Sequence, residues 1–454
     1  MKRPPRKSSP PDRRKPARTA PSATLHLVTI EKPIYGGAFL ARNQGKAIFV
    51  PLALPGEQVQ VRIVEEKKSY ASAEVVEIAA PAPERVVPAC PHFGACGGCQ
   101  YQHANYEAQL SFKQSILRET LARGDVPAPD EIAALSAAPW AYRNRIRLAF
   151  DPAGNPGYRG RRSHGIIPIA ECPIAAPLLV RAALAAAKML RSLPAAERPS
   201  ELALFCDAEE SSLLAGFSMS GQHRVPANFP FHDLCRALAE QIPPLTGAEL
   251  TSESPSGQPP RVLAQWGAPS LVYRAAGFSY RVGHGAFFQV NRWLIDAFID
   301  RVLGDARGGL AWDLFAGVGL FACRLASRFA HVAAVESAPS ATAALAHNLA
   351  GTTAEVIGAT TLDFLRRTAP AGRANRIVPD LIILDPPRTG LGAETTTLLA
   401  RVAAPALTYV SCDPATLARD LRELLASGYS IQEVVLADLF PQTFHIETIV
   451  RLRR

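Results

Sequence analysis

Strand-like and helical apolar runs alternate from residue 277 to the end of this chain, and this alternation limits the possible folds more than any other feature. The runs lie at residues 310–314, 321–329, 331–335, 341–349, 381–384, 407–410, 415–426 and 431–437. Such an order predicts an α/β domain, with a parallel sheet covered by helices on both faces. In an open sheet of this kind, ligands bind outside the carboxyl ends of the strands. We therefore expect functional side chains in the loops that follow the strands.

The rest of the chain has a different character. Four or five short strands within residues 23–81 predict a small β-barrel of the oligonucleotide-binding type. Residues 82–276 show a mixed α+β pattern and form the predicted central domain, before the α/β domain over 277–454. Residues 1–22 hold eight basic side chains and one acidic one, so we expect a disordered tail that suits a polyanion such as RNA or that serves solubility alone.

The first of the expected loops carries the segment Asp313-Leu-Phe-Ala-Gly317-Val-Gly319. Glycines there let the backbone turn sharply and approach a ligand closely. A dinucleotide fingerprint would have a third glycine where Ala322 stands. Glu336 ends the next strand, and a carboxylate at that place can accept hydrogen bonds from two ribose hydroxyls. Two glycines alone also fit a plain strand–helix turn, but together with Glu336 they favour a cofactor that contains a nucleoside.

Two further loops and one C-terminal segment carry candidate reactive groups. Asp385-Pro-Pro-Arg388 follows a strand, and its prolines predict a rigid loop. Cys412 follows another strand; a lone cysteine is usually a buried structural thiol, but at the same edge as Asp385 it is placed for nucleophilic attack. Glu447 ends the segment Phe-Pro-Gln-Thr-Phe-His-Ile-Glu and could act as a general base. Without the other motifs, it would be read as a solvated glutamate.

Three cysteines crowd into ten residues, Cys90, Cys96 and Cys99, and Cys172 is the expected fourth of the group. Four thiolates suit either an iron–sulfur cluster or tetrahedral zinc. Structural zinc sites usually take two close pairs of ligands, so a triplet with a distant single cysteine favours iron–sulfur. We see neither a secretory signal nor a long apolar span, and we expect a cytoplasmic protein without disulfides or membrane contact.

These residues resemble the RNA uracil-C5 methyltransferases, the family that includes tRNA and 23S rRNA enzymes. The resemblance covers nearly the whole chain from about residue 23. Segments 45–51 and 55–57 are similar to the family's TRAM domain, and segment 90–103 is similar to the 4Fe-4S segment of its rRNA members. Segments 142–144 and 163–172 are similar to its central domain, and segment 285–291 to the entry of its catalytic domain. The motifs that contain Asp385, Cys412 and Glu447 are together the most specific part of the resemblance.

The resemblance implies a Rossmann-like class I methyltransferase domain and a role for each candidate residue. Cys412 would be the nucleophile that forms a covalent uracil adduct, and Glu447 would be the base. S-adenosylmethionine would contact Gln289, Phe315, Glu336 and Asp385, and a 4Fe-4S cluster would be held by Cys90, Cys96, Cys99 and Cys172. The expected partner is RNA, with 23S rRNA favoured over tRNA by the cluster cysteines, and the expected state is a monomer.

The sequence departs from the family pattern at two places in the expected cofactor site. Leu320 stands where some members have an asparagine that contacts the cofactor. Gly358-Ala359-Thr360 offers no acidic residue near the adenine, and Asp363 is the available substitute.

Two other functions remain open from the residues. A nitrogen methyltransferase of the same fold would need no cysteine, and it often has an aromatic residue where Arg388 follows the prolines. A non-catalytic RNA-binding iron–sulfur protein would need neither Cys412 nor Glu447.

Overall fold

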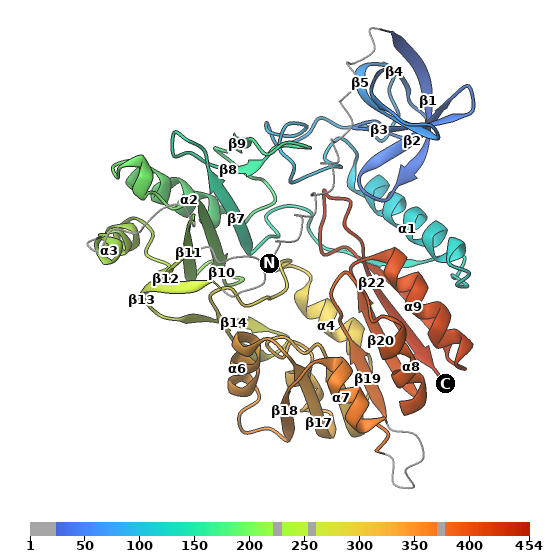
Figure 1. Ribbon diagram of the computed structural model, residues 1–454, viewed down its shortest axis with the longest axis vertical. Helices are drawn as coiled ribbons and strands as arrows, with labels where there is room; N and C mark the ends of the chain where they lie inside the picture. Colours follow the sequence, from blue (N-terminus) through green and yellow to red (C-terminus); the bar gives the residue numbers. More distant parts are fainter. Residues whose placement is uncertain (1–23, 221–228, 253–259, 370–376) are drawn as a thin grey trace, which may run out of the picture. The chain divides into compact units, whose positions relative to one another are not determined.

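The computed structural model describes residues 24–220, 229–252, 260–369 and 377–454 (Figure 1). The predicted basic tail over 1–22 lies outside these residues. The chain divides into two compact units, one ending at Arg85 and the other beginning at Val86. No helix in the described ranges is both long enough and apolar enough to span a bilayer.

The first unit is the predicted small β-barrel. Five strands close it in the order β1-β2-β3-β5-β4, and their bounds are β1 Leu25–Ile34, β2 Ala38–Asn43, β3 Lys46–Pro51, β4 Gln58–Glu66 and β5 Tyr70–Ala80. Alternate residues such as Val59 and Val61 point inward and are fully buried. The buried Glu57 carboxylate accepts hydrogen bonds from the backbone of Leu54 and Ala82 and from the Arg85 guanidinium, which fixes the chain as it leaves the barrel.

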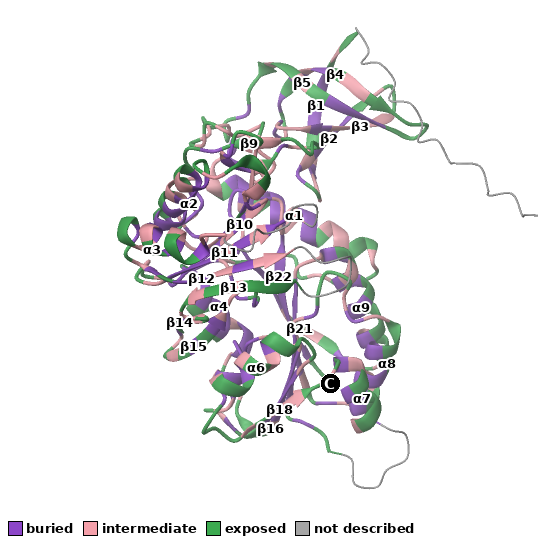
Figure 2. Cartoon of the chain, turned by 60° about the vertical axis from the view of Figure 1, so that its left-hand side comes forward, coloured by how far each residue is buried: buried purple, intermediate pink, exposed green. Residues whose placement is uncertain are grey.

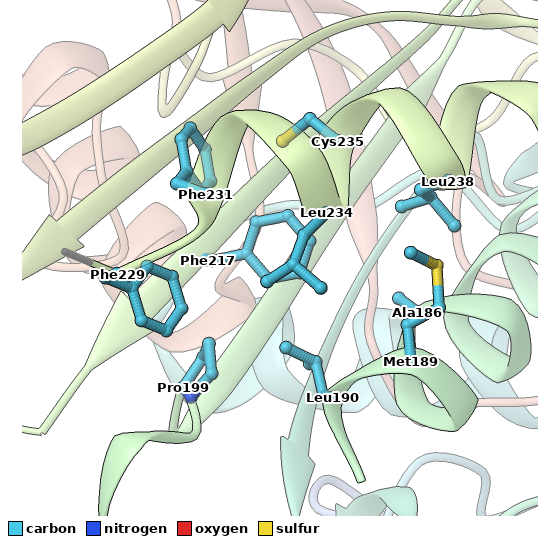
Figure 3. Close-up of a pocket in the computed structure, with 10 residues that line it drawn as sticks. All are labelled: Ala186, Met189, Leu190, Pro199, Phe217, Phe229, Phe231, Leu234, Cys235 and Leu238. Carbon is cyan, nitrogen blue, oxygen red and sulfur yellow. The ribbon is translucent and has the colours of Figure 1, made fainter. Parts of the chain in front are cut away.

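The second unit contains a seven-stranded sheet in the order β13-β12-β11-β10-β7-β8-β9. Its strands are β7 Arg145–Phe150, β8 Pro156–Arg159, β9 Ile166–Pro168, β10 Glu201–Cys206, β11 Leu213–Met219, β12 Leu245–Ser252 and β13 Arg261–Gly267. Helices α2 (Pro177–Leu190) and α3 (Phe231–Gln241) pack against it. Between these helices lies an apolar cavity of about 20 Å³, lined by residues such as Phe217 and Leu238 (Figure 3). It has room for about one water molecule and offers that water no polar partner, so it is a packing void in the core.

The second unit also contains an eight-stranded sheet in the order β18-β17-β16-β19-β20-β22-β21-β6. Its strands are β16 Gly308–Leu314, β17 Phe329–Glu336, β18 Ala354–Gly358, β19 Leu381–Leu384, β20 Ala406–Ser411, β21 Ser430–Ala437, β22 Glu447–Arg453 and β6 Ala133–Leu135. The strands from β18 to β20 run parallel, as predicted, whereas β22 is antiparallel to both of its neighbours. A separate hairpin, β14 (Ser270–Ala275) and β15 (Phe278–Gly283), leads into this sheet from the other one.

Helices cover both faces of the eight-stranded sheet. Figure 1 shows α7 (Thr361–Thr368), α8 (Ala393–Val402), α9 (Pro414–Ala426) and α1 (Tyr106–Arg123) side by side on one face. Helices α4 (Ile295–Leu303) and α6 (Pro339–Asn348) lie on the other. Strands β19 and β20 are buried along almost all of their length, and Figure 2 shows buried residues running through the middle of the sheet. This burial explains why these strands read as continuous apolar runs.

Two features of this sheet differ from the sequence prediction. The helical run predicted over 321–329 is wrong in extent: α5 spans only Ala322–Leu325, and Phe329 already begins β17. The apolar residues there are buried against the sheet from an irregular turn, so apolar content did not require a full helix. In addition, two elements that precede the predicted α/β domain in the chain belong to it in space. Helix α1 packs on α9, and strand β6 pairs with β21.

Candidate active site

The carboxyl ends of β16, β17, β19 and β20 surround one cavity of about 860 Å³. Its lining includes every residue that the sequence predicted for cofactor binding and catalysis: Gln289, Phe315, Glu336, Asp385, Cys412 and Glu447. Parallel strands end at the same edge of a sheet, which is why residues far apart in the chain meet here. Glu447 arrives differently, as the first residue of the antiparallel β22, which enters the sheet from that edge.

The turn after β16 shapes one wall of the cavity. Phe315 has φ 70° and Gly319 has φ 96°, both in the left-handed region. A side chain at Gly319 would be strained at this φ, and its Cβ would lie 2.9 Å from Leu345 Cδ1, so the Leu345 side chain would also have to shift. The backbone N–H of Gly317 donates to Oε2 of Glu336 over 2.9 Å, and those of Ser337 and Ala338 donate to Oε1. The Glu336 carboxylate is thus fixed at the cavity wall before any ligand arrives.

Asp313 is a fully buried carboxyl group on β16 that is not among the lining residues but lies near enough to feel the charges of Asp385 and Glu336. In the described part of the chain, no side chain donates a hydrogen bond to either of its oxygens, and the backbone N–H of Ala322 is the one polar group that favours its ionised form. Burial, followed by the charge of Asp385, raises its pKa to about 8. An acidic group in this state is suited to a positively charged ligand, because a nearby cation would offset the cost of ionising it.

Asp385, which is half-buried, and Glu447, which is buried, are neighbouring carboxyl groups in the lining of the cavity. Burial raises the pKa of Asp385 to about 7. Burial also raises the pKa of Glu447 well above its usual range, the charge of Asp385 raises it further, and Arg388 opposes both effects. Two neighbouring carboxyl groups in a dry site do not readily ionise together, so this pair can hold a proton at neutral pH.

The Cys412 thiol shares this environment. Burial, together with the negative charges of Glu447 and Asp385, raises its pKa to about 11, while Arg388 lowers it. The thiol is half-buried and lines the cavity beside both carboxyl groups. A positively charged ligand in the cavity would favour the thiolate, which is the nucleophilic form.

Arg388 and His445 meet at the same cavity, although they are 57 positions apart in the chain. Nη2 of Arg388 lies 3.3 Å from Nδ1 of His445. Burial, and then the charge of Arg388, lowers the pKa of His445 to about 4. Both residues belong to motifs noted in the sequence, but no spacing rule could have paired them.

A network of hydrogen bonds holds the loop that carries His445 and leads to Glu447. Gln442, at φ 68°, exchanges hydrogen bonds with the side chain of Gln109 on α1, each 2.9 Å long. Its carbonyl oxygen accepts the backbone N–H groups of Gln100 and Tyr101. The segment that directly follows Cys99 therefore braces the loop at the active site.

The four predicted cluster cysteines gather around the loop over 90–99. The backbone N–H of Gly97 donates to the carbonyl of Arg159, and that of Arg161 donates to Ala95. Burial raises the pKa of each thiol, and the charge of Cys172 raises those of the other three further. Within the described ranges, no group of three or more His, Cys, Asp or Glu residues is arranged to hold a metal ion. Cys206, Cys235 and Cys323 are buried thiols away from both groups of residues.

The two departures from the family pattern also lie at this site. Leu320 and Ala359 both line the cavity, and they offer it only apolar side chains. Asp363 does not replace the missing acidic group, because its carboxylate accepts a hydrogen bond from Thr360 at the start of α7 and pairs with Arg366.

Comparisons with known proteins identify the family to which these elements belong. The family model described as tRNA (Uracil-5-)-methyltransferase matches residues 269–454, and the TRAM domain model matches residues 26–76. The 23S rRNA (uracil(1939)-C(5))-methyltransferase RlmD of Chromohalobacter salexigens is 33% identical over 100% of this chain and 95% of its own. The chain belongs to the RNA uracil-C5 methyltransferase family. Within this family it is an enzyme that transfers a methyl group from S-adenosylmethionine to carbon 5 of uracil in RNA.

Other relatives and a solved structure agree with this placement. A Nitratidesulfovibrio vulgaris protein named as an uncharacterized RNA methyltransferase is 30% identical over 94% of this chain and 95% of its own. The crystal structure of Pyrococcus abyssi tRNA (uracil-54, C5)-methyltransferase with S-adenosyl-L-homocysteine has a TM-score of 0.74 at 24% identity. It covers 94% of this chain and 100% of that one, so the two share one fold from the barrel to the last strand.

Proposed function

We propose that this enzyme methylates a uridine of 23S rRNA and that Cys412 forms a covalent adduct with the base. The observation that carries the proposal is that Cys412 and Glu447 line the same cavity as the predicted cofactor contacts. The relatives from Chromohalobacter salexigens and Halomonas elongata, which match nearly the whole chain, are named as enzymes for a 23S rRNA uracil. A tRNA uridine is the second candidate, because the matching catalytic family model carries a tRNA description.

The lining of the cavity fits S-adenosylmethionine. Glu336 is placed to accept hydrogen bonds from the ribose hydroxyls, and Gln289 and Phe315 line the same cavity. The half-buried carboxyl group of Asp385 in the lining, with the buried one of Asp313 near it, suits the positive charges of the sulfonium and ammonium groups. The cofactor supplies an electrophilic methyl group when bound.

The protein groups supply what the uracil lacks. Carbon 5 is a poor nucleophile, and addition of the Cys412 thiolate to carbon 6 moves the electrons of the 5,6 double bond towards carbon 5 and O4. Carbon 5 then attacks the methyl group, Glu447 removes the hydrogen from carbon 5, and the bond to Cys412 breaks to restore the double bond. This route splits one difficult step into easier ones. The raised pKa of Glu447 makes it a stronger base than an exposed carboxylate once it has lost its own proton.

The RNA has to deliver its base out of the stack, because Cys412 lies inside the cavity. The β-barrel would hold phosphates, which position the RNA without specifying the base. We propose that the enzyme acts in the cytoplasm, where its RNA is available. We also propose that it acts as a monomer.

The thiols of Cys90, Cys96, Cys99 and Cys172 would hold a 4Fe-4S cluster. This proposal is supported by the cysteine spacing and by the effect that the thiols have on one another's pKa, and the thiols of the described structure would have to move together to hold the cluster. We propose that the cluster stiffens the segment over 90–103 and, through Gln100 and Tyr101, the loop at Gln442. Iron and sulfide content of protein purified without oxygen tests the cluster itself: Cys99→Ser should lower both, and protein with neither in its wild-type form would overturn this part of the proposal.

The test of the main function is to map 5-methyluridine by mass spectrometry in 23S rRNA and tRNA from cells with and without this protein. Cells that carry the Cys412→Ala variant should lose the same modification. Cys235→Ala is the matched control, because Cys235 is buried beside the central sheet. If loss of the protein removes 5-methyluridine from tRNA and not from 23S rRNA, the rRNA assignment is wrong. If Cys412→Ala retains it, the covalent route is wrong.

A further inference from the structure

Arg388 and His445 create a hydrogen-bonding surface in the cavity that the reaction scheme leaves unused. The Arg388 side chain is exposed at the cavity, and its Nη2 lies 3.3 Å from His445 Nδ1. Arginine has only donors, so the guanidinium donates and Nδ1 accepts. This hydrogen bond fixes the tautomer of the ring.

The tautomer decides what the other ring nitrogen can do. A neutral imidazole that accepts at Nδ1 carries its proton at Nε2, which makes Nε2 a donor. The low pKa of His445 keeps the ring neutral over the working range. Packing against Phe440 and Phe444, with ring centroids 5.4 Å and 4.4 Å away, fixes the orientation of the ring. Among the described residues, Nε2 has no hydrogen-bond partner, so it is available to a ligand in the cavity that the ring lines.

The surrounding groups indicate which atom of the substrate these donors meet. Glu447 removes the hydrogen from carbon 5, so it has to lie beside carbon 5 of the bound uracil. O4 is attached to the ring atom next to carbon 5, whereas O2 lies on the far side of the ring. His445 is two residues from Glu447, and Arg388 affects the charge state of both Glu447 and Cys412. The donors therefore face the O4 side of the base.

We infer that Arg388 and His445 bind O4 of the target uracil and thereby select uracil over cytosine and stabilise the enolate. This inference rests on the proposed covalent route. Thiolate addition to carbon 6 places negative charge on O4, where two donors aimed at that atom are most effective. Cytosine carries an amino group in the place of O4, so two donors would face a third donor and no hydrogen bond could form.

The test measures how fast a trapped adduct forms through thiolate addition and methyl transfer, apart from the final elimination that releases Cys412. RNA that carries 5-fluorouridine at the mapped target has no removable hydrogen at carbon 5, so the enzyme stays bound covalently. His445→Phe keeps the ring packing but removes both nitrogens, and we expect adduct formation about 100-fold slower. His445→Gln can accept from Arg388 and donate to O4, so it should recover most of the rate. His331→Phe, at an exposed histidine at the opposite end of β17, should match wild type.

The second readout is base selection. With transcripts that carry uridine or cytidine at the target, the ratio of methylation rates should fall in His445→Phe because only the uridine rate drops. Affinity for S-adenosylmethionine, measured by calorimetry, should stay unchanged. Adduct formation at the wild-type rate in His445→Phe, or a His445→Gln variant as slow as His445→Phe, would overturn the inference. A wild-type enzyme that makes no 5-methyluridine would overturn the proposed function instead.

Discussion

Nζ of Lys113 lies 2.6 Å from Oδ1 of Asp438, and both side chains are completely buried. The same ammonium group donates to the carbonyl of Phe440, and Asp438 also accepts from the hydroxyl of Tyr106. Helix α1 is thus joined to the end of β21, where the loop towards Glu447 begins. A buried ion pair contributes little net stability when complete, but removal of one partner leaves an unpaired buried charge.

We expect Lys113→Met to lower the free energy of unfolding by about 3–5 kcal/mol, because Asp438 would lose its counter-ion. Lys113→Met with Asp438→Leu should recover part of the loss. The measurement is urea unfolding followed by circular dichroism. Lys46→Met is the control, since the Lys46–Glu66 pair is exposed and screened by solvent and should contribute far less. Equal losses in Lys113→Met and the control would show that the buried pair does not stabilise the unit.

The buried carboxyl groups at the cavity predict how the stability of the cofactor-free enzyme depends on pH. The pKa values of about 8 for Asp313 and about 7 for Asp385 lie above those of unfolded aspartate, about 3.9. Between these limits, the folded protein holds protons that the unfolded chain has released, so stability should fall as the pH rises from about 4 to about 8. Unfolding curves across this range should show a smaller fall in Asp313→Asn. An unchanged slope in that variant would contradict the prediction.

Binding of S-adenosylmethionine should release protons near neutral pH. The positive charges of the cofactor favour the ionised forms of Asp313 and Asp385 and lower their pKa values. Calorimetric titrations at about pH 7 in buffers with different ionisation enthalpies measure the number of protons released. Binding with no dependence on the buffer would show that neither group changes its protonation state. Asp385→Asn should reduce both proton release and affinity.

Alkylation of Cys412 should be slow at neutral pH and faster at higher pH. Its pKa of about 11 leaves little thiolate in the cofactor-free enzyme. Bound S-adenosylmethionine should accelerate the reaction with iodoacetamide wherever the reagent still reaches the thiol, because a nearby cation favours the thiolate. Mass spectrometry of the peptide that contains Cys412 gives the rate, and Cys412→Ala gives the background. A fast reaction at neutral pH without cofactor would contradict the raised pKa.

Glu447→Gln should stop the reaction after methyl transfer. The amide cannot remove the hydrogen from carbon 5, so the bond between Cys412 and carbon 6 persists. We expect a protein–RNA band that survives denaturing electrophoresis, with labelled methyl groups in it. Cys412→Ala combined with Glu447→Gln should give no such band. A free 5-methyluridine product at the wild-type rate would assign the base to another group.

Much of the fold could be predicted from the chain because local signals agree with it. Helix α1 is one example, since apolar residues such as Ile116 and Leu121 recur at helical spacing, and the structure adds a cap from Asn105 at its first turn. Strand β6 could not be predicted: Ala133–Leu135 has no alternation and no β-branched residue, and only the open edge beside β21 makes it a strand.

The candidate site shows the same division. Its motifs follow strands, so topology alone predicts that Asp385 and Cys412 meet. The pairing of Arg388 with His445 depends on how a loop without regular structure lies, and the brace at Gln442 depends on contacts 333 residues apart in the chain. Such contacts leave no periodic trace in a sequence.

Strand β6 also has a consequence for the synthesis of the protein. The ribosome releases residues 133–135 long before β21, the neighbour with which they pair, so this pairing waits until the chain is nearly finished. The residues between β6 and β21 therefore have to fold before β6 has its partner strand. A truncated gene that starts at the hairpin before α4 would yield a sheet with β21 as a bare margin, open to other chains.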